Sequence, residues 1–254
     1  MLPLLRADLF KLHKSWIMWM LWSIMLLFVI GYMLLEVLVE PSRVAFPFPS
    51  GMLTVGMIMQ GLGIFLLIFF CAQMVGNEFA YDTWKNLLPR HPGRVGFIVS
   101  KWLTSVFAIV TGLLLMLLGA VLMGFLLQAT FHLTGSVDSL SLGDTLLIVL
   151  VQSLFAIVAG TVSIMGTVVG RSVVVGIIIG FAWLIADIAL GQLLPESWRV
   201  LTFTVASRSL EAYATGTSTP YALLLDLLVM VVYLILPIVL AAYVFRQRDI
   251  LGPA

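Results

Sequence analysis

The sequence predicts an all-α membrane protein with six transmembrane helices, and three observations lead to this fold class. Hydrophobic residues make up 62% of the 254 residues, and charged residues only 10%, whereas a typical soluble domain carries about 25% charged residues. The apolar residues form continuous runs rather than an alternating pattern, so membrane-spanning strands are not expected. The runs are close to or longer than the roughly 20 residues that a helix needs to cross a bilayer.

The first segment, residues 2–15, is expected to form an amphipathic helix in the membrane surface. Apolar residues recur there at helical spacing, namely Leu2, Leu5, Leu9, Leu12 and Trp16. Polar and charged residues fill the other faces, namely Arg6, Asp8, Lys11, His13 and Lys14. The alternative is a charged flank that only fixes the topology.

The six expected spans are 16–39, 52–76, 95–129, 145–170, 172–190 and 221–245, within a single transmembrane domain of residues 1–254. The third span is long enough to tilt or to extend beyond the bilayer. The first is too long for the apolar region of a signal peptide, which has 7–15 residues, and no A-x-A-like cleavage site follows it. We therefore expect an uncleaved first span.

The distribution of lysine and arginine predicts the orientation. Ten of the 13 lie at one set of span ends, namely Arg6, Lys11, Lys14, Lys85, Arg90, Arg94, Lys101, Arg171, Arg246 and Arg248. The other three, Arg43, Arg199 and Arg208, lie at the opposite ends. Both termini are therefore expected in the cytoplasm, in a multi-pass protein of an inner (plasma) membrane.

A polar block, residues 77–94 (NEFAYDTWKNLLPRHPGR), follows the second span on the cytoplasmic side. Its first part carries charges and aromatic residues at spacings that suit a short amphipathic helix, namely Glu78, Tyr81, Asp82, Trp84 and Lys85. Aromatic anchors are typical of protein interfaces. Pro89 and Pro92 end this helix. The alternative is a solvated loop that only sets the topology.

The longest outer segment, residues 191–220, is not simply polar and includes Trp198 and Phe203. Pro195 followed by Glu196 suits the start of a helix. We expect one or two short or re-entrant helices dipping into the outer leaflet. The alternative is a capping helix with no role in transport.

Motifs for catalysis are missing from the sequence. There is no G-x-x-x-x-G-K-[ST], so the chain has no P-loop, and no H-E-x-x-H, C-x-x-C or G-x-S-x-G. The three histidines lie at or beyond the span ends, and Cys71 is the single cysteine. We expect no catalytic residue, no metal site and no cofactor on this chain.

Polar residues within the spans are few. Glu36, Asp187 and Asp226 lie near the outer span ends, which favours snorkelling or interfacial placement over a charged transport route. Gln60 and Gln73 are the candidate pathway residues, although Gln60 suits a helix–helix hydrogen bond equally well.

Taken together, these features resemble the permease subunits of type-2 (ABC-two) ABC exporters. In that family a Glu after the second span precedes a small residue and Thr, a Leu-Leu pair, a Pro, an Arg and a Lys. This chain offers, in that order, Glu78, Asp82, Thr83, Leu87, Leu88, Pro92, Arg94 and Lys101. It departs from the pattern in Asp82, where the family often has Gly, and in the additional Pro89, Arg90 and His91.

The resemblance implies that the block forms a coupling helix that docks on a separate cytosolic ATPase. The coupling residues would be Glu78, Tyr81, Asp82, Thr83, Trp84, Lys85, Leu87, Leu88 and Arg94. Arg6, Lys11, Lys14 and Lys101 would mark the cytoplasmic edge. Two permease chains, expected to be identical, and two ATPase subunits carrying ATP and Mg²⁺ would export a substrate. The alternatives are a stand-alone secondary transporter or channel, and a membrane anchor for a cytosolic partner. A nucleic-acid partner is not expected.

Overall fold

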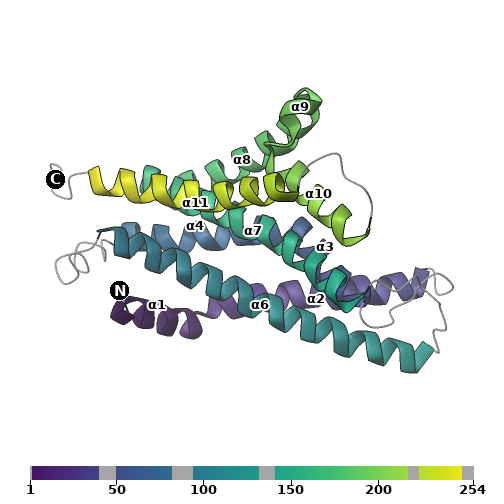
Figure 1. Cartoon of the computed structure of the whole chain (residues 1–254). Helices are drawn as coiled ribbons and strands as arrows, with labels where there is room; N and C mark the ends of the chain where they lie inside the picture. The colour runs from purple at the N-terminus through teal and green to yellow at the C-terminus, as the bar shows by residue number, and fades with distance from the viewer. Residues whose placement is uncertain (1, 40–49, 82–93, 132–140, 217–222, 248–254) are drawn as a thin grey trace.

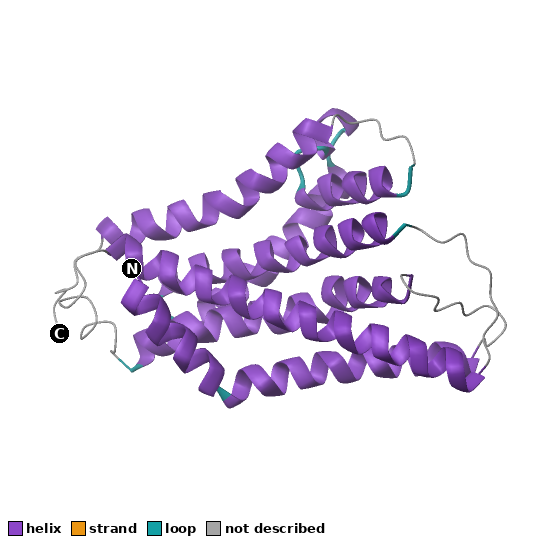
Figure 2. Cartoon of the chain, turned by 60° about the horizontal axis from the view of Figure 1, so that its bottom comes forward, coloured by secondary structure: helices purple, strands orange, loops and turns teal. Residues whose placement is uncertain are grey.

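The computed structural model describes residues 2–39, 50–81, 94–131, 141–216 and 223–247. Within these ranges the chain is helical and contains no strand. The long helices run side by side in an elongated bundle, with both ends of the chain at the same end of the bundle (Figures 1 and 2). Among the described residues, six helices are long and apolar enough to cross a membrane, which confirms the predicted number of spans.

The chain starts with helix α1 (Leu2–Lys14), and Ser15 separates it from the first span, α2 (Trp16–Val39). The bounds of α2 are those predicted from the sequence. Helix α1 packs against α6 (Arg94–Phe131), the long third span. The helix direction changes at Ser15, and in Figure 2 the helix next to the N-terminus runs obliquely to the spans.

The second span departs from a uniform helix. After a short 3₁₀ turn, η1 (Ser50–Met52), it consists of α3 (Leu53–Ile58), the π-helical segment η2 (Met59–Gly63) and α4 (Ile64–Ala80). A π segment inside a helix is rare and is often found at functional sites. Helix α4 continues to Ala80, so residues 77–80 of the predicted polar block form the last turn of this span.

Helix α7 (Leu142–Gly170) is the most buried span and lies at the centre of the bundle. It contacts α4, α8 (Val173–Leu193) and α11 (Leu223–Gln247). Small residues line much of its surface and let neighbouring helices approach closely. They are Ala156, Ala159, Gly160, Ser163 and Gly166, all buried.

Helix α8 packs closely on this central helix through two glycines that are four residues apart, Gly176 and Gly180. A Cβ on Gly176 would overlap Thr167 of α7, and a Cβ on Gly180 would crowd Ile68 of α4. The turn between α7 and α8 is tight, because Arg171 adopts a left-handed conformation with φ of 50°. The G-x-x-x-G spacing of these two glycines therefore marks a helix-packing face.

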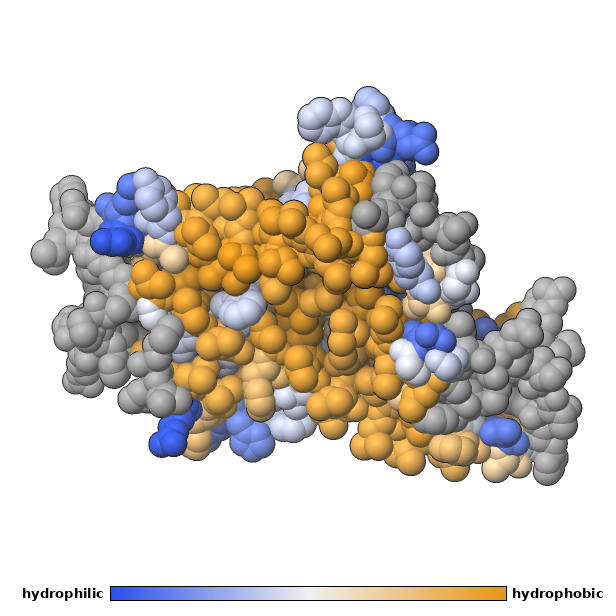
Figure 3. Space-filling view, in the orientation of Figure 1, coloured by the Kyte–Doolittle hydropathy of each residue, from blue (hydrophilic) through white to orange (hydrophobic). Residues whose placement is uncertain are grey.

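Two short helices follow α8, in agreement with the prediction for residues 191–220. They are α9 (Glu196–Arg199) and α10 (Phe203–Ala214), and α10 packs against α7, α8 and α11. The visible face of the molecule is apolar along the middle of the bundle, and hydrophilic residues gather towards its two ends (Figure 3). This pattern is the one expected for a protein that spans a membrane.

Candidate functional site

An ion cluster joins three helices at the end of the bundle that holds the N-terminus. The Lys101 ammonium of α6 contacts Asp8 Oδ1 of α1 at 2.7 Å and Glu78 Oε1 of α4 at 2.9 Å. The Ser100 hydroxyl donates to Asp8 Oδ2 at 3.0 Å. A second lysine, Lys11 of α1, reaches Glu78 Oε1 at 3.2 Å. We refer to Asp8, Lys11, Glu78 and Lys101 as the ion cluster.

Burial divides the ion cluster into an inner and an outer part. Lys101 is only 2% exposed, and Asp8 and Glu78 are also buried, whereas the side chain of Lys11 is 58% exposed. Removing charges from water is costly, and it is tolerated when the charges are paired and hydrogen-bonded. Two carboxylates and two ammonium groups balance each other here, so the cluster carries no net charge.

The packing face of α1 differs from the one the sequence predicted. The leucine spacing suggested a stripe that includes Leu5 and Leu9, with Asp8 on another face. In the structure the buried positions are Leu4, Asp8 and Leu12, which follow one another at intervals of four residues. The prediction was wrong for Asp8 because its charge is neutralised by Lys101. The signal in the sequence that could have revealed this buried face is the spacing of four residues between Leu4, Asp8 and Leu12.

Lys101, which the resemblance placed at the cytoplasmic edge of the third span, is buried at the end of the bundle that holds the N-terminus. Its position at the edge of the membrane stays a prediction. Its ammonium lies inside the protein, 5.5 Å from the centre of the Phe97 ring, in addition to its two carboxylate contacts. Arg6 and Lys14, predicted at the same edge, are exposed. The lysine inside the third span therefore acts as an internal partner, while the outer cations of α1 remain at the surface.

The structure describes only part of the predicted coupling residues. Glu78 belongs to the ion cluster, and Tyr81, just beyond the end of α4, is 75% exposed. Arg94 starts α6, and its side chain is outside the described part. Asp82, Thr83, Trp84, Lys85, Leu87 and Leu88 lie outside the described residues. Their role in coupling stays a prediction.

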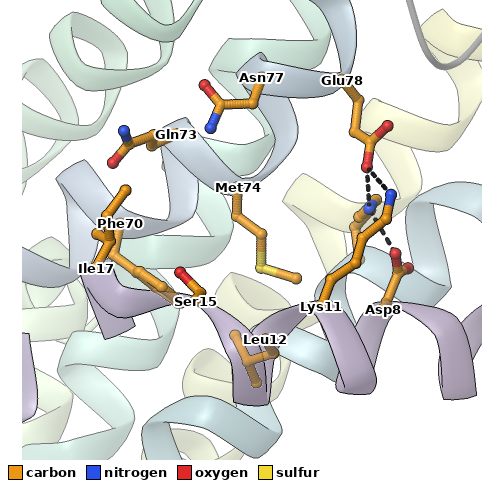
Figure 4. A pocket seen from close by; sticks show the side chains of 11 residues that line it. Asp8, Lys11, Leu12, Ser15, Ile17, Phe70, Gln73, Met74, Asn77 and Glu78 are labelled. Carbon is orange, nitrogen blue, oxygen red and sulfur yellow. Dashed lines mark hydrogen bonds and ion pairs between the residues drawn. The ribbon is translucent and has the colours of Figure 1, made fainter. Parts of the chain in front are cut away.

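A cavity adjoins the ion cluster between α1, the first turn of α2 and the last turns of α4. Gln73 lines it, together with Asn77 and Met74 from the same helix (Figure 4). The other candidate pathway residue, Gln60, is partly exposed and belongs to the π segment η2. The two glutamines are thus separated along the span.

Buried hydrogen bonds to α8 and α11 attach α10 to the bundle at the opposite end. The Asp187 carboxylate of α8 accepts hydrogen bonds from the backbone N–H groups of Phe203 and Thr204, at 2.9 and 2.8 Å, and caps the start of α10. The Ser209 hydroxyl donates to Asp226 of α11 at 2.6 Å. Snorkelling was the wrong interpretation for Asp187 and Asp226, because both carboxylates are buried.

Gln152 of α7 lies close to Glu211 of α10. Burial raises the pKa of the Glu211 carboxyl, and the Gln152 hydrogen bond and the Arg208 charge oppose this effect.

The two residues predicted in the outer segment differ in environment. Trp198 is 60% exposed, whereas Phe203 is fully buried.

Phe203 packs in an aromatic cluster with Phe155 of α7, Trp183 of α8 and Tyr233 of α11. Aromatic contacts of this kind add to the free energy gained from burial alone. Helix α10 is therefore a well-packed part of the protein core rather than a loosely attached outer helix.

The described residues contain no group of three or more histidine, cysteine, aspartate or glutamate side chains that would hold a metal ion. The six apolar helices define a multi-pass helical membrane protein. Buried polar contacts join its helices at both ends of the bundle.

Comparison of the sequence with known protein families shows which family this chain belongs to. The family described as "ABC-2 family transporter protein" matches residues 4–187, which is more than half of the chain. The chain therefore belongs to the ABC-2 transporter family, as the resemblance in the sequence suggested. Its members are membrane components of ABC transporters and not the ATPases. No curated protein matches the chain.

Proposed function

We propose that this chain is the transmembrane permease subunit of an ATP-driven exporter. Two permease chains, two identical copies in the simplest arrangement, form the translocation pathway. Two copies of a separate cytosolic ATPase bind ATP and Mg²⁺ and supply the energy. Family membership supports a permease, and this sequence contains no P-loop motif, which is consistent with ATP hydrolysis on a partner.

In the proposed orientation, both termini and the polar block face the cytoplasm. The excess of lysine and arginine at this end supports it, because positively charged residues favour the cytoplasmic side. The even number of spans agrees with two termini at the same end of the bundle (Figure 1). The short helices α9 and α10 then face the outside.

The observation that carries the coupling proposal is the position of the ion cluster at the base of the block. Helix α4 ends at Ala80 and α6 begins at Arg94, so the block leaves and returns at adjacent helix ends. Glu78 and Lys101, one on each helix, are bonded to each other. A force that an ATPase exerts on the block would therefore reach α4 and α6 together, because the ion pair joins these two helices.

The same lysine passes this force to α1, because its ammonium also binds Asp8. Tyr81 is the first largely exposed aromatic residue after α4, so it is a better candidate for ATPase contact than the buried Glu78. Trp84, outside the described residues, is the second candidate. These two aromatic residues are the ones to change in a test of docking.

The test is to purify the tagged chain gently from its native membrane and to determine the masses of the intact complexes. We expect two copies of this chain with two copies of a P-loop ATPase. Recovery of the chain alone, under conditions that preserve known complexes, would favour a stand-alone transporter. The double variant Tyr81→Ala/Trp84→Ala should still insert but lose the ATPase and transport.

Phe10→Ala is the matched control, because Phe10 is 69% exposed at the same end of the bundle but belongs to α1. It should keep the ATPase at the wild-type ratio. Normal ATPase recovery and normal transport in the Tyr81 and Trp84 double variant would refute the coupling role of the block.

A further inference from the structure

The cavity beside the ion cluster is large for a site that holds only structural water. Its volume is about 210 Å³, whereas one buried water needs only about 10–15 Å³ by the same kind of measure. Four helices contribute to its wall: α1, α2, α4 and, through Lys101, α6. Among the described residues its lining combines charged, amide, hydroxyl and apolar side chains.

The carboxylates in the wall are already engaged. Asp8 binds Lys101 through one oxygen and Ser100 through the other. Glu78 binds both lysines of the cluster. A ligand entering the cavity therefore meets acids whose charge is balanced.

Hydrogen-bond donors remain available on the other lining residues. Lys11 is the exposed cation of the cluster, and its 3.2 Å contact with Glu78 uses only one of its three N–H groups. Within the described residues, the side chains of Ser15, Gln73 and Asn77 make no hydrogen bond. One ammonium, two amides and one hydroxyl suit an anionic group with several acceptor oxygens.

The remaining wall is apolar and includes Leu12, Phe70, Met74 and Ile17. Phe70 and Leu12 are buried, whereas Ile17 is 38% exposed in the first turn of span α2. The two exposed lining residues, Lys11 and Ile17, therefore lie on either side of the junction between α1 and the first span. Figure 4 shows the amides of α4 on one side of Met74, and Ser15 and Leu12 on the other.

We propose that this cavity binds the phosphate headgroup of an amphiphile from the membrane leaflet on the α1 side. Lys11, Ser15, Gln73 and Asn77 bind the phosphate oxygens, and the apolar chain leaves over Ile17. An anionic phosphate is attracted to the exposed cation, and a chain beside the first span stays in hydrocarbon. That this leaflet is cytoplasmic rests on the orientation in the proposed function.

The test measures lipid binding to the full-length purified chain by native mass spectrometry. The probes are phosphatidylglycerol and a neutral glucosyl diacylglycerol with the same acyl chains. We expect phosphatidylglycerol to bind at least about tenfold more tightly, because each hydrogen bond to a charged group contributes on the order of a tenfold gain. Equal binding of the two lipids would overturn the proposal.

Two variants locate the binding to the cavity. Gln73→Leu/Asn77→Leu removes both amides and leaves the ion cluster unchanged, so phosphatidylglycerol should bind at least about tenfold more weakly. Lys14→Gln, an exposed lysine of α1 outside the cavity lining, is the control and should bind like the wild type. Unchanged binding in the double leucine variant, with an unchanged melting temperature, would refute this site.

A competition with inorganic phosphate separates the headgroup from free phosphate. Millimolar phosphate should leave the lipid bound, because it gains nothing from the apolar wall. Displacement of the lipid by phosphate at concentrations similar to those of the lipid would overturn the amphiphile assignment. None of these measurements requires an ATPase, so a negative result here is distinct from a failure of the exporter proposal.

Discussion

Replacing Lys101 by methionine is the sharpest test of the ion cluster. Methionine keeps most of the length of the side chain but removes the ammonium, and it leaves Asp8 and Glu78 buried without their shared partner. Breaking a buried ion pair in this way costs about 3–5 kcal/mol. Lys101 is 2% exposed, so water cannot replace the lost contacts at little cost.

Lys11→Met is a matched comparison, since Lys11 and Lys101 bind the same oxygen of Glu78. The Lys11 side chain is 58% exposed, and an exposed ion pair contributes about 0–1 kcal/mol. The free energy of unfolding can be measured by reversible unfolding in mixed micelles, followed by circular dichroism. It should be highest for the wild type, slightly lower for Lys11→Met and much lower for Lys101→Met.

A triple variant distinguishes the loss of charge balance from the loss of packing. Asp8→Asn/Glu78→Gln/Lys101→Met removes all three buried charges and should recover much of the stability that Lys101→Met loses, because a neutral set of similar volume needs no counter-charge. Equal effects of the two single lysine variants, or no recovery in the triple variant, would refute the electrostatic account of this cluster.

Three further predictions concern the other end of the bundle and the orientation. Asp187→Asn should cost about 1–2 kcal/mol, because it weakens the cap of α10, and should speed amide hydrogen exchange in residues 203–214 while α2 is unaffected. Burial raises the pKa of Glu211 above its ordinary 4.5. The contribution of the protonated Glu211 carboxyl to the free energy of unfolding is therefore fully present below pH 4.5, and it is lost as the pH rises through the raised pKa. Glu211→Gln should remove this loss and raise the denaturation midpoint at neutral pH, as measured by chemical unfolding at several pH values. Cysteines placed in residues 196–213 should react with an impermeant maleimide in intact cells, and cysteines placed in 85–93 should not. The wild-type Cys71 should not react, because it is fully buried. Labelling in the reverse sense would overturn the orientation.

The number and length of the spans could be predicted because the bilayer imposes a strong constraint. A backbone in hydrocarbon must satisfy its own hydrogen bonds, so each apolar run of sufficient length becomes a helix. For this reason the expected span 16–39 has the bounds of α2. The π segment within the second span could not be predicted, because it changes the hydrogen-bond register without changing the apolar character of the run.

The faces of the helices were harder to predict, because a helix with apolar residues on several sides does not reveal which side meets protein and which meets lipid. Asp8 illustrates this, since its burial depends on Lys101, which lies 93 residues away in the sequence. The Asp187 cap is a second case, because its hydrogen bonds go to another helix. Such contacts between distant segments leave no periodic signal in the sequence.

The ion cluster connects three parts of the chain that the proposed mechanism requires to move together. Glu78 lies in the last turns of α4, before the polar block, Lys101 lies in α6 after the block, and Asp8 lies on α1. Separating any one of these helices from the others would break at least one buried ion pair, at a cost of several kcal/mol. Small, independent movements are therefore disfavoured, whereas a joint movement that keeps the contacts costs little. A block pushed by an ATPase would move α1 along with α4 and α6, and the cavity between α1 and α4 would keep its ion-paired wall during the stroke.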